Sequence, residues 1–207
     1  MSLPELFTEI RACSVCASRL PLGPRPIIRG NAGSKILIIG QAPGTRVHAS
    51  GIPWDDESGK RLRSWLGLTR EQFYDENTIA IMPMGFCYPG KGKSGDLPPR
   101  PECSLLWHDR VLGLMPEIKL TVLVGQYAQA RYLKESRKKN LTEIVKAWQE
   151  YEGLGYLPIV HPSPRNGIWL RKNSWFENDV VPFLQQKVRL LNSSIRQAEV
   201  SKCLNLG

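Results

Sequence analysis

The chain has 207 residues, 42% hydrophobic and 23% charged, a composition typical of a globular domain and not of a disordered protein. Lys and Arg total 28 against 19 Asp and Glu, and the net charge of +9 indicates either a polyanionic partner such as a nucleic acid or a solvated basic surface. No apolar run approaches the roughly 20 residues of a membrane span, and residues 1–7 do not resemble a secretory signal. We therefore expect a cytoplasmic protein with no membrane contact, and a monomer by default.

Hydrophobic spacing predicts helices and strands that alternate along the chain. In chain order we expect a helix over residues 3–11, a strand over 35–39, a helix over 58–66, a strand over 78–82, a helix over 101–114, a strand over 120–124, helices over 126–133 and 141–151, a strand over 157–160 and a helix over 174–192. Loops are expected over 21–34, 40–57, 85–101 and 135–139. The alternation implies an α/β fold in which helices cover both faces of a parallel sheet. We assign residues 1–193 to one domain and 194–207 to a polar tail.

Two loops of unusual composition follow strands of the predicted sheet. Residues 40–57 follow the first strand, and residues 161–167 follow the fourth. Parallel sheets bind their ligands beyond the carboxyl ends of the strands. We therefore predict an active site where these two loops converge.

Four cysteines form two pairs, with two residues between Cys13 and Cys16 and 15 residues between Cys87 and Cys103. In a reducing compartment, clustered cysteines indicate metal binding or catalysis rather than disulfides. Thiolates hold zinc or an iron–sulfur cluster, and the spacing alone leaves the metal open. The alternative is that these cysteines are small core residues. A bound metal would anchor the second loop and make folding metal-dependent, while Cys203 is expected to be a free thiol.

Sequence motifs occur in a defined order along the chain. They are Gly40-Gln-Ala-Pro-Gly44, Gly51-Ile-Pro-Trp54 followed by Ser58-Gly59, the four cysteines, and His161-Pro-Ser-Pro-Arg-Asn166. Together they resemble the uracil-DNA glycosylase superfamily, especially its iron–sulfur-containing bacterial and archaeal branches, over about residues 5–190. The resemblance implies a three-layer α/β/α sandwich with a central four-stranded parallel sheet. It also implies a 4Fe–4S cluster on Cys13, Cys16, Cys87 and Cys103, with zinc as the alternative.

The resemblance further implies an enzyme that hydrolyses the N-glycosidic bond of a damaged base in DNA. Such a base must leave the duplex and enter a pocket, where Trp54 would stack on it. His161 would donate a hydrogen bond to a base oxygen that becomes negative as the bond breaks. The residues expected to contact the base or the DNA are Gly40, Ala42, Pro43, Gly44, Trp54, Ser163, Arg165 and Asn166.

The sequence departs from the family at Gln41, where the acid-containing branch has a water-activating Glu. We expect Gln41 to line the pocket. A nearby carboxylate, from Asp55, Asp56 or Glu57, would then activate water or stabilise the cation. We favour Asp56 among the three, and the alternative is a solvated acidic helix N-terminus.

A second departure is Pro83, which stands where the family reads uracil with an Asn side chain. Proline offers neither a side-chain amide nor a backbone N–H, so the pocket should discriminate uracil poorly. We expect the substrate base to be uracil or another deaminated base such as hypoxanthine. Residues 91–95, Lys-Gly-Lys-Ser-Gly, suit either phosphate contact or a solvated loop. The competing functions are an inactive nucleic-acid-binding module of the same fold and a hydrolase of free nucleosides.

Overall fold

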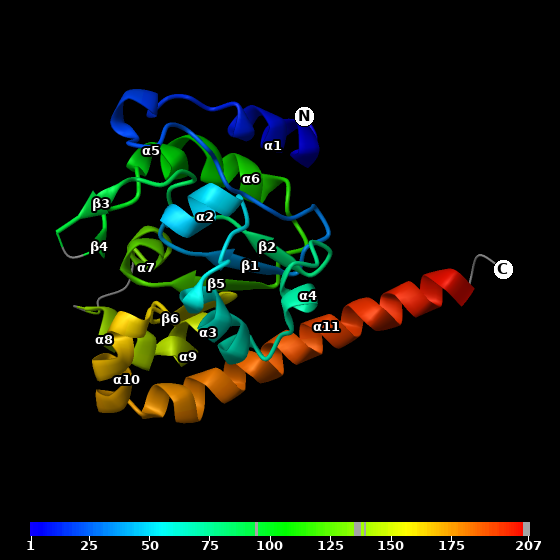
Figure 1. Ribbon diagram of the computed structural model, residues 1–207. Coiled ribbons are helices and arrows are strands. Elements are labelled where there is room, and N and C mark those ends of the chain that lie inside the picture. The colour runs from blue at the N-terminus through cyan, green and yellow to red at the C-terminus, as the bar shows by residue number, and fades with distance from the viewer. Residues whose placement is uncertain (94, 135–137, 139, 205–207) are drawn as a thin grey trace.

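The computed structural model describes residues 1–93, 95–134, 138 and 140–204, with 194–204 as backbone alone. Its centre is a four-stranded sheet in the order β2-β1-β5-β6 (Figure 1). The strands are β1 (Ile36–Ile39), β2 (Ile79–Ile81), β5 (Leu120–Val124) and β6 (Tyr156–Ile159). Every pairing in this sheet is parallel, so the predicted sheet is confirmed.

Helices cover both faces of the sheet (Figure 1), because successive side chains of a strand point to opposite sides. Ile36 and Ile38 of β1 face one layer, and Leu37 and Ile39 face the other. The helices of the first layer are α3 (Glu57–Leu66), α4 (Arg70–Phe73), α8 (Leu141–Lys146), α10 (Gly167–Lys172) and α11 (Val181–Leu204). Those of the second include α1 (Leu3–Arg11), α5 (Pro101–Cys103), α6 (Asp109–Gly113) and α7 (Gln126–Tyr132). The three-layer α/β/α arrangement is therefore confirmed.

Most predicted elements occur where the apolar pattern placed them. The predicted helix over 3–11 and strand over 120–124 match α1 and β5 residue for residue. The predicted helix over 101–114 is one helical segment, in which a π-helical turn over Ser104–His108 joins α5 to α6. The predicted helix over 141–151 is divided at Ala147 into α8 and α9 (Trp148–Glu152).

Two predicted loops contain short regular elements, and for these the prediction was wrong. The first loop contains α2 (Thr45–Ser50), whose last carbonyls accept hydrogen bonds from the distant Arg25 guanidinium. The 85–101 loop contains an antiparallel hairpin of β3 (Lys91–Gly92) and β4 (Gly95–Asp96). Such short elements depend on tertiary contacts, so local pattern does not reveal them.

The C-terminal helix also differs from its prediction, because α11 continues through Leu204 instead of ending near residue 192. The predicted tail therefore prolongs a helix over residues 194–204, which projects beyond the sheet in Figure 1. The charged connection at 135–139 lies outside the described residues except for Lys138. Across the part of the chain that the structure describes, we find no helix with the length and apolar content needed to cross a bilayer.

Candidate active site

A cavity of about 650 Å³ lies where the chain leaves the carboxyl ends of β1 and β6. This volume is within the range of small-ligand sites. The cavity is lined by every residue that the sequence analysis assigned to catalysis, the base or the DNA: Gly40, Gln41, Ala42, Pro43, Gly44, Trp54, Asp56, His161, Ser163, Arg165 and Asn166. The two loops therefore meet as predicted, while the chemical roles of these residues stay predictions.

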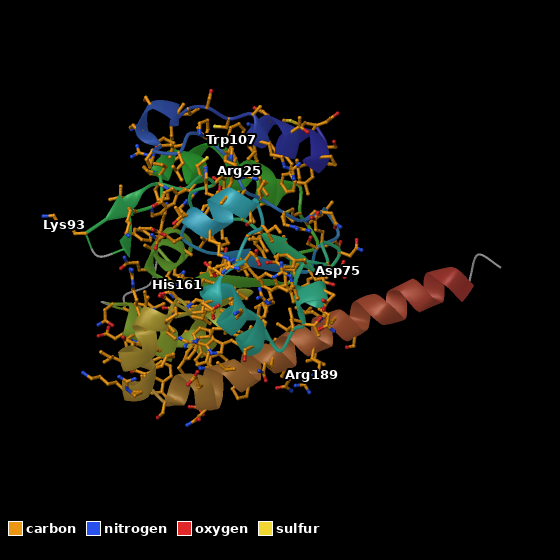
Figure 2. All side chains as sticks on the ribbon, in the orientation of Figure 1. Arg25, Asp75, Lys93, Trp107, His161 and Arg189 are labelled. Carbon is orange, nitrogen blue, oxygen red and sulfur yellow. The ribbon has the colours of Figure 1, made fainter. Side chains whose placement is uncertain are left out.

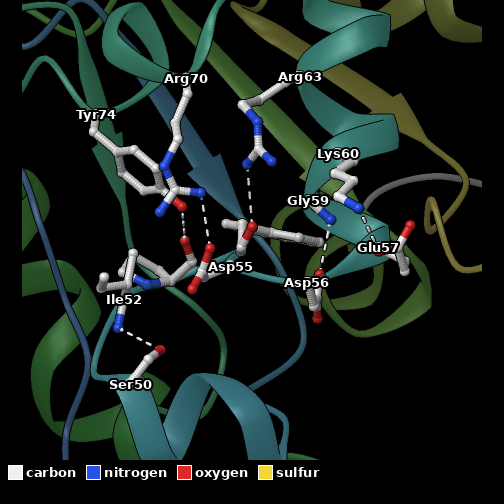
Figure 3. A network of polar contacts seen from close by, with 12 residues as sticks. Ser50, Ile52, Asp55, Asp56, Glu57, Gly59, Lys60, Arg63, Arg70 and Tyr74 are labelled. Atoms are coloured by element: carbon white, nitrogen blue, oxygen red, sulfur yellow. Dashed lines mark hydrogen bonds and ion pairs between the residues drawn. The ribbon is translucent and has the colours of Figure 1, made fainter.

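Trp54 has a left-handed backbone conformation, with φ at +58°. For a bulky residue this conformation costs about 1–3 kcal/mol and persists only where the surroundings impose it. Here the Trp54 carbonyl accepts a hydrogen bond from Arg63 Nη1 at 3.1 Å, and the neighbouring Pro53 carbonyl accepts one from Tyr74 at 2.7 Å (Figure 3). These contacts hold the turn that presents the indole to the cavity.

Two glycines leave the space that Trp54 occupies. A Cβ atom at Gly40 would lie 2.7 Å from Cζ2 of the indole. A Cβ atom at Gly59, in the first turn of α3, would lie 1.7 Å from the Trp54 carbonyl oxygen. Any side chain at either position would therefore displace the ring or its backbone.

His161 lies against Trp54, with ring centroids 5.6 Å apart and planes inclined by 34°. The backbone N–H of Ser163 donates to His161 Nδ1 at 3.1 Å. Because Nδ1 is the acceptor, the neutral ring carries its proton on Nε2. Burial lowers the pKa of His161, and the nearby Asp56 opposes this only in part. The site therefore contains a neutral imidazole with one N–H donor left for a ligand.

The three acidic residues after Trp54 have different surroundings (Figure 3). Asp55 pairs with Arg70 at 2.8 Å, and Glu57 pairs with Lys60 at 2.6 Å. Only Asp56 among the three lines the cavity. Its Oδ1 caps α3 by accepting the Gly59 N–H at 2.8 Å, which leaves its other oxygen for a ligand or water.

Gln41 binds the β3–β4 hairpin, because its Nε2 donates to the Leu97 carbonyl at 3.1 Å. This contact brings Asp96, the last residue of the hairpin, to the cavity wall. Burial raises the pKa of Asp96, although Arg165 and Lys91 oppose that rise. The sequence analysis missed Asp96, and the only available signal was an acid inside a Gly- and Lys-rich segment.

Pro83 also lines the cavity, at the position where a base-reading Asn was expected. Its carbonyl accepts a hydrogen bond from His108 Nε2 at 3.1 Å, and His108 Nδ1 is 2.6 Å from the Tyr132 hydroxyl. A carbonyl only accepts, so Nε2 carries the proton and Nδ1 accepts from Tyr132. Burial lowers the pKa of His108 to about 4. A neutral, buried histidine therefore fixes Pro83 from behind the cavity.

The four predicted metal ligands line a separate small cavity of about 20 Å³. Burial raises the pKa of Cys87 to about 11, and the neighbouring Cys13 and Cys16 contribute to that rise. Burial also raises the pKa of Cys103 to about 12, while the Phe86 N–H donates to its sulfur at 3.4 Å. The fold thus brings four thiols from distant segments to the wall of one cavity.

The donor chemistry of this cavity fits a sulfur-bound metal group. Nε of Arg100 is buried at the cavity and has no hydrogen-bond partner among the described residues, so it could donate to a thiolate or sulfide. Among those same residues, no three His, Cys, Asp or Glu side chains converge as the ligands of one ion. The four thiols therefore share one cavity without converging on a single ion position. A 4Fe–4S cluster does not need such convergence, because each of its four irons takes one thiolate.

Comparison with protein families gives a match over most of the chain. The family model described as the uracil DNA glycosylase superfamily matches residues 27–185. This range contains the whole sheet and both loops of the cavity, and it begins after Cys13 and Cys16.

Proposed function

The chain belongs to the uracil DNA glycosylase superfamily, and from this premise we propose that it excises a damaged base from DNA. Membership supports a glycosylase-type hydrolase of DNA repair that acts on DNA. One observation carries the finer proposal: Trp54 and His161, from loops far apart in the chain, face one cavity with their rings 5.6 Å apart. An extruded base would stack on Trp54 and receive a hydrogen bond from His161.

In the proposed reaction the C1′–N bond breaks, and its electron pair remains on the base. A water oxygen then bonds to C1′, and its proton passes to a carboxylate of the cavity wall. The Nε2–H of His161 would stabilise the negative charge on a base oxygen. The free oxygen of Asp56 would stabilise the positive charge on the sugar. Both groups favour the transition state more than the intact nucleotide, which is the condition for catalysis.

The DNA backbone would be held by the loop after β6. The Ser163 carbonyl accepts from Arg61 Nη1 at 3.2 Å, and Asn166 Nδ2 donates to the His161 carbonyl at 2.7 Å. These bonds would position Ser163, Arg165 and Asn166 for phosphate and groove contacts. The net charge of +9 supports such contacts.

The substrate base is proposed to be uracil or another deaminated base such as hypoxanthine. Pro83 offers no side-chain amide to the cavity, and its carbonyl is already bound to His108. Selectivity for uracil over its relatives should therefore be weak, because no donor–acceptor pair at this position rejects them.

Cys13, Cys16, Cys87 and Cys103 would hold a 4Fe–4S cluster, with zinc as the alternative. When bound, this group would supply a structural cross-link between the N-terminal segment and the segment that carries the hairpin. Nε–H of Arg100, which has no hydrogen-bond partner in the part of the chain that the structure describes, would stabilise the negative charge of the sulfur ligands. We also propose that the protein acts as a monomer.

The proposal is tested with labelled DNA carrying uracil, hypoxanthine, xanthine or hydroxymethyluracil, followed by alkaline cleavage at abasic sites. Strand breaks are expected with at least one base, and His161→Ala should reduce them by about 100-fold or more. Lys172→Ala, an exposed change on α10, is the control for purification and handling.

A second candidate is a nucleic-acid-binding module without catalysis, which is favoured by the amide at Gln41 in place of an acid. Tight DNA binding without breaks at any base would support this alternative. Release of a base from free nucleosides but not from DNA would instead favour a nucleoside hydrolase.

A further inference from the structure

The β3–β4 hairpin lies beside the cavity and extends away from the sheet (Figure 1). Lys93 lies at its outer end in Figure 2. At the inner end, Asp96 pairs in register with Lys91, so the last residue of β4 lies next to the body of the protein. The hairpin thus brings a carboxylate from the inter-cysteine segment to the edge of the active site.

Asp96 is held in place through the residue that follows it. The Leu97 N–H donates to the Gly90 carbonyl at 2.8 Å, which closes the base of the hairpin. The Leu97 carbonyl accepts from Gln41 Nε2 at 3.1 Å, which joins the hairpin to the loop after β1. Both bonds fix the backbone of Asp96 relative to that loop.

The carboxylate of Asp96 lies over Gly44, the last glycine before α2. A Cβ atom at Gly44 would be 3.5 Å from Asp96 Oδ2, which is ordinary van der Waals contact. Asp96 lines the same cavity as Trp54 and His161. Arg165 and Lys91 are the cations that act on it, and Asp56 is the neighbouring anion.

We propose that Asp96 is the carboxylate that binds and deprotonates the attacking water, in place of the acid that Gln41 lacks. In this step the C1′–N electron pair has already passed to the base, and the Asp96 carboxylate takes a proton from the water whose oxygen bonds to C1′. Gln41 is then a positioning residue that acts through the Leu97 carbonyl. This inference rests on the proposed glycosylase function.

Two further observations support Asp96 over Asp56 for this step. One oxygen of Asp56 is already bound to the Gly59 N–H as the cap of α3, so fewer of its lone pairs are available to a water molecule. Burial raises the pKa of Asp96, which makes it a stronger base, while Arg165 and Lys91 favour its ionised form. Two carboxylates at one site thus have different surroundings and can serve different roles.

The test compares Asp96→Asn with wild type under single-turnover conditions, on the base that wild type excises best. The expected result is a fall in rate of about 100-fold or more, the usual size of general-base catalysis. The dissociation constant for the same DNA should change by less than about threefold, because Asn preserves shape. Asp96→Glu should recover part of the rate, and Gln41→Leu should lower the rate about tenfold without weakening DNA binding.

Asp109→Asn is the matched control, since the Asp109 side chain is 79% exposed and lies on α6. If Asp96→Asn and Asp109→Asn both react at the wild-type rate, the role of Asp96 is overturned while the glycosylase function stands. If wild type excises no base, the proposed function fails and this inference fails with it. If Asp96→Asn does not fold, Asp96→Ser is tested instead, and the same fall in rate of about 100-fold or more is expected.

Discussion

Acid should destabilise this protein through His108, the buried histidine behind Pro83. Its pKa falls from an ordinary value of 6.5 to about 4, because burial disfavours the charged ring. Between these values the unfolded chain binds a proton that the folded protein does not, so stability falls as the pH falls. The contribution of neutral His108 to the free energy of unfolding is complete well above pH 6.5. It is reduced by about 2 kcal/mol at pH 5 and by about 3 kcal/mol below pH 4.

The measurement is urea unfolding followed by tryptophan fluorescence between pH 7.5 and pH 5, for wild type and His108→Phe. The Phe variant keeps an aromatic ring against Phe86 but leaves Tyr132 and the Pro83 carbonyl without their partner. At pH 7.5 it should be destabilised by about 2–4 kcal/mol. The difference in the free energy of unfolding between wild type and the variant should shrink by about 2 kcal/mol at pH 5, because the variant has no imidazole to protonate.

The other titrating groups are common to both proteins, so the difference between wild type and variant isolates His108. A deficit that stays constant from pH 7.5 to pH 5 would refute the assignment of a neutral, buried His108. The variant should also excise its base more slowly, because Pro83 would lose the bond that fixes it at the cavity.

Three further predictions concern the site and the cysteines. Gly40→Ala should slow excision about 10- to 100-fold in single-turnover assays, because the added Cβ would displace the Trp54 indole. The control is Gly113→Ala, where the added Cβ meets nothing within 4 Å. An effect of Gly40→Ala no larger than that of this control would contradict the prediction. Asp56→Ala should lower the free energy of unfolding by about 1 kcal/mol through loss of the α3 cap, whereas Asp56→Asn, which retains a cap, should not. Cys87→Ser should lower both bound iron and the thermal midpoint of anaerobically purified protein, and unchanged iron content and visible absorbance would exclude Cys87 as a ligand.

The local sequence pattern was sufficient to predict the strands of the sheet and the two active-site loops. The strand over Ile36–Ile39 is buried on both faces, so its unbroken apolar run identifies it without any partner. Helix α1 carries its own start signal, a capping box between Ser2 and Glu5. The loop motifs were readable because turns and ligand contacts demand particular residues at particular spacings.

Other features have no local signature. Helix α2 is only six residues long and depends on Arg25, twenty or more positions earlier in the chain, to satisfy its last carbonyls. The hairpin at Lys91–Asp96 has strands of two residues, too short for an alternating pattern. Pattern reading consequently assigned both segments to loops.

The sequence by itself determined the main strands and helices and their succession along the chain, the two loops that form the active-site cavity, and the four cysteines that line a separate cavity. Only the tertiary structure decided that Asp96 reaches this cavity, that His108 fixes Pro83, and that Trp54 has a left-handed backbone. The physical reason is that each of these depends on a bond or close approach between residues distant in the chain. Periodicity and residue type report on a residue's own segment, and such long-range contacts exist only once the layers have packed.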